Sequence, residues 1–121
     1  MKILIIDDSK FARRGVLKHF TSIFNGEFTH FEADNGETAL EIHKREEPEL
    51  VFLDLTLPGI RGQDVLGNIK SSGIKSIVIV ITADIQKKTK EEVVLLGADV
   101  VINKPITAEK LKEALNSLNT Q

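Results

Sequence analysis

The sequence predicts an α/β fold of the flavodoxin-like, doubly wound type, with a five-stranded parallel sheet in the order 2-1-3-4-5 and helices on both faces. Two observations support this prediction. Short apolar runs without polar alternation are typical of parallel strands covered on both faces. These runs alternate with segments whose apolar residues recur at helical spacing, so the element order is βαβαβαβαβα with right-handed crossovers.

The strands are indicated by β-branched residues and leucine. Four strongly apolar runs are expected to form strands: Ile3–Ile6, Leu50–Leu53, Ile77–Ile81 and Val100–Ile102. The segment Glu27–Ala33 is more polar, which predicts a strand at the edge of the sheet.

The helices are indicated by apolar stripes and by the turn residues between them. The stripes are Ala12, Val16, Phe20, Ile23 and Phe24; then Val65, Leu66 and Ile69; then Leu111, Ala114, Leu115 and Leu118. Turn residues interrupt the chain at Asn35-Gly36, Pro48, Pro58-Gly59, Gly73, Gly97 and Lys104-Pro105. The charged run Lys87–Glu92 is expected on the fourth helix.

Length and composition exclude several classes of protein. The chain has 121 residues, no cysteine and a formal net charge of -2. This length fits one domain, and the charge gives no basic surface for nucleic acid. The longest apolar run, Ile77–Ile81, is far shorter than the ~20 residues of a membrane span. We therefore expect a soluble, cytoplasmic protein that has no disulfide bond and binds neither nucleic acid nor membrane.

Polar residues lie where the predicted strands end. In doubly wound sheets the functional crevice lies outside the carboxyl ends of the strands. Asp7 and Asp8 follow the first strand, Asp54 the third, Thr82 the fourth, and Lys104 lies just beyond the fifth. These residues are therefore expected to lie on one rim of the sheet.

This set of residues suits a divalent cation and a phosphoryl group. The carboxylates Asp7, Asp8 and Asp54 offer only oxygen ligands, which hard ions prefer, and Mg²⁺ fits better than Ca²⁺ because it commonly bridges carboxylates to phosphate. Thr82 can donate to one phosphoryl oxygen, and Lys104 can neutralise another. Asp54 is placed to be the nucleophile, since aspartate can form an acyl phosphate.

Each residue also has a simpler interpretation when it is taken alone. The pair Asp7-Asp8 could cap the first helix, and Thr82 could cap the fourth. Asp54 could be a turn residue at a strand end, and Lys104 could be solvated. These interpretations give no reason for all of the residues to lie at successive strand ends.

The chain resembles the receiver domain of bacterial two-component response regulators over essentially all of its length. The matching segments are Asp7-Asp8, Asp54-x-x-x-Pro58-Gly59, Thr82-Ala83 and Lys104-Pro105, in type, order and spacing. The resemblance implies that a histidine kinase or phosphotransfer protein phosphorylates Asp54, and that Thr82 and Lys104 sense the phosphoryl group. It also implies that Mg²⁺ binds Asp8, Asp54 and the backbone carbonyl of Thr56 directly and Asp7 through water, and that the Lys104–Pro105 bond is cis.

The chain departs from the family pattern at one position on the fifth strand. Val101 stands where the family often has a Tyr or Phe that acts as a switch. We therefore expect the response to depend on the loop after Thr82 and on the fourth helix. The resemblance also implies that Thr56, two positions after Asp54, and Asp84, two positions after Thr82, flank the entry path of attacking water, so they should affect the lifetime of the phosphoryl group.

The resemblance also implies the partners. A single receiver domain over residues 1–121 with no attached output domain resembles the chemotaxis response regulator and phosphorelay intermediates. Such proteins catalyse only their own phosphoryl transfer and autodephosphorylation, and they bind an output protein through the fourth helix, fifth strand and fifth helix. The run Lys87–Glu92 is either part of that surface or a solvated face.

Three other classes share parts of this pattern. An FMN-binding flavodoxin needs a hydroxyl- and glycine-rich loop after the first strand, and a dinucleotide enzyme needs G-x-G-x-x-G, whereas this chain has Asp-Asp-Ser-Lys there. The alternative enzyme is a haloacid-dehalogenase-type phosphatase, which also uses a strand-end aspartate with Mg²⁺. That family usually has its nucleophile near the start of the chain.

Overall fold

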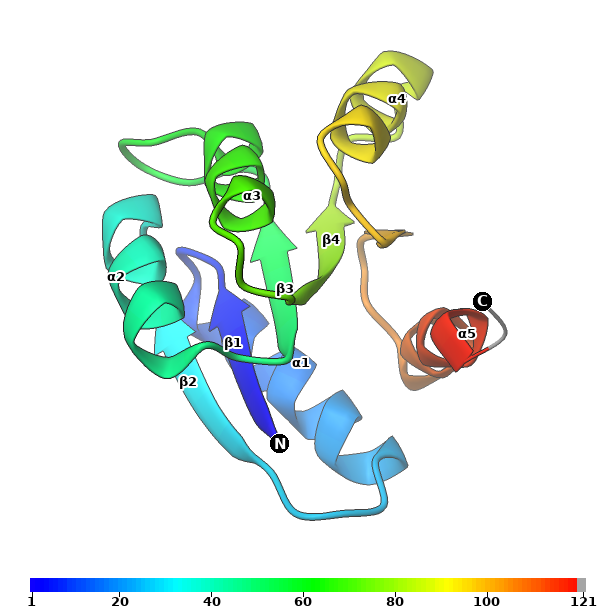
Figure 1. Ribbon diagram of the computed structural model, residues 1–121. Helices are drawn as coiled ribbons and strands as arrows, with labels where there is room; N and C mark the ends of the chain where they lie inside the picture. The colour runs from blue at the N-terminus through cyan, green and yellow to red at the C-terminus, as the bar shows by residue number, and fades with distance from the viewer. Residues whose placement is uncertain (120–121) are drawn as a thin grey trace.

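The computed structural model describes residues 1–119 as alternating strands and helices (Figure 1). The strands are β1 (Lys2–Ile6), β2 (Thr29–Ala33), β3 (Leu50–Asp54), β4 (Ile77–Thr82) and β5 (Val100–Asn103). The helices are α1 (Lys10–Ile23), α2 (Gly36–Glu46), α3 (Gly62–Ser71), α4 (Lys87–Leu95) and α5 (Ala108–Asn119). The strands pair in parallel in the order β2-β1-β3-β4-β5, which confirms the predicted fold.

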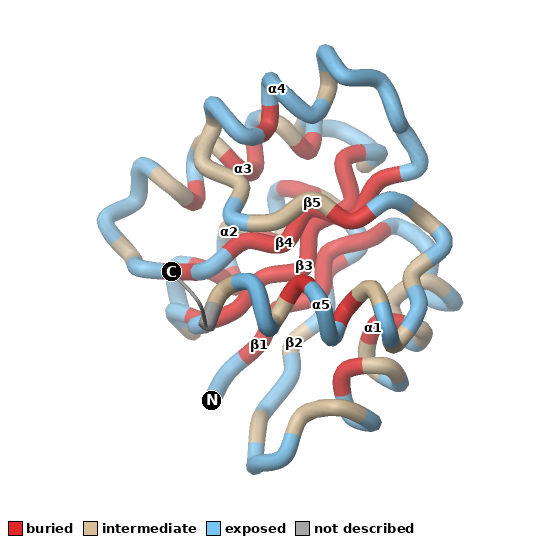
Figure 2. The backbone as a smooth tube through the Cα atoms, turned by 90° about the vertical axis from the view of Figure 1, so that its right-hand side faces the viewer, coloured by how far each residue is buried: buried red, intermediate tan, exposed pale blue. Residues whose placement is uncertain are grey.

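Helices cover both faces of this sheet, and each face has its own apolar core (Figures 1 and 2). On one face, α2, α3 and α4 contribute Ile42, Leu66 and Val93. On the other face, α1 and α5 contribute Phe20 and Leu111. Side chains alternate between the faces along a strand, so a strand with both faces covered must be apolar throughout.

The edge strand β2 begins two positions later than its sequence predicts. The first ladder pair joins Lys2 to Thr29, so no residue of β1 is available to pair with Glu27 or Phe28. The ring of Phe28 packs instead against Phe20, with ring centroids 4.9 Å apart. Strands β3, β4 and β5 each extend one residue beyond the apolar run, because a polar side chain does not prevent backbone pairing.

The helix α4 is more loosely attached to the sheet than the other helices. Val93 is its only buried residue, and most of the helix is exposed (Figure 2). It begins at Lys87, and four residues separate it from the end of β4 at Thr82. Among residues 1–119, no helix combines the length and apolar character needed to cross a bilayer.

A buried polar contact ties three segments together at the amino ends of the strands. His43 Nε2 lies 2.9 Å from the hydroxyl of Ser76, which donates to the carbonyl of Pro48 at 2.6 Å. Because that hydroxyl has one hydrogen, His43 must be the donor in its own bond to Ser76. The sequence suggested no role for His19, His30 or His43, but His43 joins α2 to the start of β4.

Candidate functional site

Three carboxylates meet at the carboxyl ends of β1 and β3, as the sequence predicts. One oxygen from each of Asp7, Asp8 and Asp54 lies within 4.8 Å of the others. Asp7 and Asp54 are each only 5% exposed, whereas Asp8 is exposed. β1 and β3 are neighbours in the sheet, so residues far apart in the sequence reach one point at this rim.

Asp7 is fixed by its neighbours on both sides. Its Oδ1 accepts a hydrogen bond from the backbone N–H of Ser9 at 2.9 Å, and its carbonyl accepts from Arg13 Nη1 at 2.7 Å. The cap of α1 is Ser9, whose hydroxyl accepts from the N–H of Ala12 at 3.1 Å. The acidic pair is therefore not the helix cap.

Lys104 reaches across the rim to two of the carboxylates. Its Nζ donates to Asp7 Oδ2 at 3.2 Å and lies 3.4 Å from Asp54 Oδ2. Burial by itself lowers the pKa of the Lys104 ammonium, but the charges of Asp54 and Asp7 outweigh burial, and the net pKa is raised. The lysine is thus charged and paired rather than merely solvated. The Lys104–Pro105 peptide bond is cis, as the family resemblance implies.

The charge of Asp54 is disfavoured by its surroundings. Burial raises the pKa of this carboxyl above its ordinary value, and the nearby carboxylate of Asp7 raises it further, while Lys104 and the N–H of Thr56 act in the opposite direction. One lysine therefore faces a cluster of three carboxylates. This all-oxygen donor set, with two buried members, fits a hard divalent cation such as Mg²⁺.

Thr82 lies on the next strand of the sheet, beside the carboxylates. Asp54 pairs in register with Ile81, so Thr82 ends β4 at the same rim. It is 3% exposed, and its hydroxyl accepts from the N–H of Asp84 at 3.1 Å. The residue that caps α4 is Gln86, so Thr82 does not begin the helix itself.

The loop after Asp54 is closed by a glycine that the sequence did not single out. Thr56 is exposed, and its N–H donates to Asp54 Oδ1 at 3.4 Å. The N–H of Gly62 donates to the carbonyl of Leu55 at 3.2 Å, and a Cβ at Gly62 would lie 2.4 Å from Leu55 Cα. Only glycine fits this approach, because the obstructing atoms belong to backbone.

The sequence predicted no role for Arg13, which lies beside the acidic pair, and Val101 on β5 is the position that differs from the family pattern. Arg13 binds both the Asp7 carbonyl and Glu32 Oε1, the latter at 2.9 Å, but its spacing from Asp7 carries no motif. Val101 is half-buried and packs against the core on the α2, α3 and α4 face. The position of the family's aromatic switch is thus a packing position here.

Comparisons with known proteins agree on one family. A model of the "Response regulator receiver domain" matches residues 3–116. Chemotaxis protein CheY-3 of Vibrio cholerae is 37% identical over 120 residues, which is 98% of this chain and 91% of that protein. Sporulation initiation phosphotransferase F of Bacillus subtilis is 34% identical over 119 residues, covering 94% of this chain and 90% of the relative.

A solved structure gives the same result in three dimensions. The CheX–CheY–BeF3–Mg+2 complex from Borrelia burgdorferi contains a chain that superimposes with a TM-score of 0.88 at 29% identity. The match covers 100% of this chain and 90% of the other.

Proposed function

Because the chain belongs to the response regulator receiver domain family, we propose that it accepts a phosphoryl group on Asp54 and in response changes its binding to an output protein. The family acts in phosphorelays, so the general role follows from membership. The acceptor, the metal ligands and the partners of this chain are our proposals.

One observation supports Asp54 above every other residue. Its carboxylate ends β3 at the centre of the rim, 3.4 Å from the ammonium of Lys104 and next to the acidic pair of β1. A nucleophile, a cation and a group of oxygen ligands at one point are the parts that phosphoryl transfer needs, since this reaction depends mainly on positioning and charge neutralisation.

The proposed reaction forms one bond and breaks another. A carboxylate oxygen of Asp54 attacks the phosphorus of a phosphohistidine on the donor protein. The P–N bond breaks, and the histidine nitrogen keeps the electron pair and takes up a proton. Lys104 and the hydroxyl of Thr82 hold oxygens of the phosphoryl group on the resulting acyl phosphate.

The acidic cluster is the proposed magnesium site. Asp8, Asp54 and the backbone carbonyl of Thr56 would bind the ion directly, and Asp7 would bind it through water. When bound, Mg²⁺ supplies positive charge that offsets the repulsion among the carboxylates and withdraws electron density from the phosphoryl oxygens.

Members of this family are regulatory, and the only reactions proposed for this chain are its own phosphorylation and dephosphorylation. In dephosphorylation, water attacks phosphorus, the bond to Asp54 breaks, and the carboxylate and inorganic phosphate are released. The match over residues 3–116 leaves the phosphatase alternative without support.

The proposed donor is a sensor histidine kinase or phosphotransfer protein, and the proposed output surface is formed by α4, β5 and α5. The relatives of this chain include proteins named for chemotaxis and for sporulation phosphotransfer. Chemotaxis is therefore one candidate pathway.

We place the protein in the cytoplasm, which suits a chain without cysteine. A net charge of -2 gives no reason to expect a nucleic-acid partner.

The test is incubation with acetyl phosphate and Mg²⁺, followed by intact-mass spectrometry. The wild-type chain should gain one phosphoryl group, and Asp54→Asn should gain none. Asp64→Asn is the matched control, because Asp64 is an exposed aspartate on α3 and should leave phosphorylation unchanged. If Asp54→Asn is phosphorylated to the same extent as the wild type, the acceptor has been wrongly assigned.

A further inference from the structure

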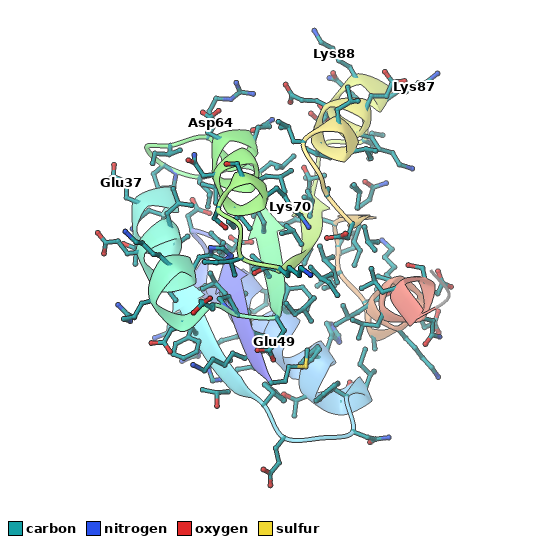
Figure 3. All side chains as sticks on the ribbon, viewed as in Figure 1. Glu37, Glu49, Asp64, Lys70, Lys87 and Lys88 are labelled. Carbon is teal, nitrogen blue, oxygen red and sulfur yellow. The ribbon has the colours of Figure 1, made fainter. Side chains whose placement is uncertain are left out.

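The start of α4 lacks the features that usually stabilise a helix beginning. Gln86, at the cap position, makes no side-chain cap bond, and the first turn contains no acidic residue. It contains Lys87 and Lys88 instead, whose side chains extend into solvent (Figure 3). Cations near the amino end of a helix oppose its dipole, so this first turn is weak by itself.

Asp84 supplies what this helix start lacks. Its Oδ1 accepts from the N–H of Gln86 at 2.9 Å, and its Oδ2 accepts from the hydroxyl of Thr89 at 2.6 Å. One carboxylate thus holds both the residue before α4 and a residue of its first turn. The bonds from Thr89 and then Gln86 hold the pKa of Asp84 below its ordinary value, as expected for a charged acceptor.

Asp84 is in turn held by Thr82. The backbone N–H of Asp84 donates to Thr82 Oγ1 at 3.1 Å. A continuous series of hydrogen bonds therefore runs from the buried hydroxyl of Thr82, through Asp84, to Thr89. The hydroxyl of Thr82 is the group proposed to turn toward a phosphoryl group on Asp54.

The other end of α4 is anchored separately. Val93 is buried in the core, and Glu92 accepts from Gln63 Nε2 on α3 at 3.1 Å. Beyond the helix, Lys70 of α3 holds Asp99 at 2.7 Å. The start of α4 can therefore be released while its end stays attached.

We infer that Asp84 is a positioning residue that transmits displacement of Thr82 to the first turn of α4 through its bonds to Gln86 and Thr89. This inference rests on the proposed function, because phosphorylation supplies the displacement. When the hydroxyl of Thr82 turns to the phosphoryl oxygen, the backbone N–H of Asp84 loses its hydrogen-bond acceptor. The carboxylate of Asp84 then moves and releases the start of α4. The phosphoryl signal thus reaches α4 through backbone and short side chains, without an aromatic residue at position 101.

The test uses substitutions at Thr89, because changes at Asp84 itself would also alter water access to the acyl phosphate. Thr89→Val removes the hydroxyl and keeps the branched shape, whereas Thr89→Ser keeps the hydroxyl and is the matched control. Amide hydrogen exchange is measured by NMR with and without beryllofluoride plus Mg²⁺. The informative amides are Asp84, Gln86 and Lys90, since the N–H of Lys90 closes the first turn on the Gln86 carbonyl at 3.2 Å.

In the wild type and in Thr89→Ser, beryllofluoride should speed exchange several-fold at all three amides. In Thr89→Val, Gln86 and Lys90 should already exchange several-fold faster in the free protein, and beryllofluoride should add little there while still affecting Asp84. The inference would be overturned if beryllofluoride sped exchange at Lys90 in Thr89→Val as much as it does in the wild type. It would also be overturned if exchange at the Asp84 amide of the wild type did not respond to beryllofluoride. Thr89→Ala provides a second variant lacking the hydroxyl.

The same samples separate this inference from the proposed function. All Thr89 variants should gain one phosphoryl group from acetyl phosphate by intact mass. A wild-type chain that gains none overturns the proposed function and the transmission that depends on it. A chain that gains one without any change at Gln86 and Lys90 overturns only the transmission through Asp84.

Discussion

Asp54 is a residue whose proposed chemical role conflicts with the stability of the fold. Burial and then the Asp7 carboxylate raise its pKa. A carboxyl group with a raised folded-state pKa stabilises the fold below its unfolded pKa, and that contribution is lost as the pH rises through the folded value. At neutral pH the ionised carboxylate is therefore less favourable in the folded chain than in the unfolded chain.

Asp54→Asn should consequently increase the free energy of unfolding, by on the order of 1 kcal/mol. Urea unfolding at pH 7 in the presence of a chelator measures this difference. Asp8→Asn removes an exposed carboxylate from the same cluster and should give a smaller gain. A loss of stability in Asp54→Asn would mean that the attraction of Lys104 outweighs burial and the repulsion from Asp7.

At the scale of single elements, the loop after β3 depends on one close backbone contact. A Cβ at Gly62 would lie 2.7 Å from the Leu55 carbonyl oxygen, and the bond between these residues closes the loop behind Asp54. Gly62→Ala should therefore lower the free energy of unfolding by about 1–3 kcal/mol and slow phosphorylation. Urea unfolding and intact-mass time courses measure the two effects.

Gly67 in the same helix is the matched control. An added Cβ there would meet only Leu96 Cδ2, at 3.9 Å. Gly67→Ala should increase stability by about 0.5–1 kcal/mol, because alanine favours the helix. If both substitutions had the same effect, the contact with Leu55 would not be what requires glycine at position 62.

The junction of α2 with β4 should make stability depend on pH. Burial lowers the pKa of His43 below its ordinary value of 6.5, and the charge of Glu47 acts in the opposite direction without cancelling this effect. The unfolded chain then takes up a proton at a higher pH than the folded chain. The free energy of unfolding should therefore fall as the pH drops from about 6.5 toward the lowered folded-state pKa.

His43→Gln should reduce this pH dependence, whereas His30→Gln should retain it, because His30 is exposed on β2. The free energy of unfolding is measured with urea between pH 7.5 and pH 5 for each variant and for the wild type. Asp54 contributes a pH dependence of the opposite sign, and this contribution cancels when each variant is subtracted from the wild type. An unchanged slope in His43→Gln would assign the pH dependence to other groups.

At the scale of the whole molecule, the proposed metal site joins the ends of β1 and β3, which are neighbours in the sheet. A ligand that binds only the folded chain stabilises all of it by mass action. Above the dissociation constant, each tenfold increase in free Mg²⁺ should add about 1.4 kcal/mol to the free energy of unfolding. Thermal unfolding at a series of Mg²⁺ concentrations measures this effect.

Asp8→Ala should abolish the response to Mg²⁺, whereas Asp34→Ala, an exposed aspartate outside the cluster, should retain it. A wild-type melting temperature that does not depend on Mg²⁺ would contradict the metal site.

The topology could be predicted from the sequence because four of the five strands contain an unbroken apolar run and most of the breaks contain a turn residue. Asp7, Asp54, Thr82 and Lys104 could be placed on one rim because parallel strands end on the same side. The start of β2 could not be placed, because it depends on which residue of β1 is available for pairing.

Contacts that depend on the detailed path of the backbone could not be predicted either. The need for glycine at position 62 arises where the start of α3 touches Leu55. The chain contains 8 glycines, and nothing in the sequence distinguishes Gly62 from the others. His43 meets Ser76, 33 positions away, through a geometry that no motif describes. The link from Asp84 to Thr89 likewise depends on where α4 begins.

The pairing of Lys104 with Asp7 has a consequence for protein synthesis. These residues are 97 positions apart, and the aspartates all precede the lysine in the chain. A ribosome releases the chain from its amino end, so the acidic residues emerge well before the lysine that neutralises part of their charge. An incomplete nascent chain therefore has the proposed acceptor Asp54 without its cation, and we expect it to become competent for signalling only when Lys104, just beyond β5, has emerged.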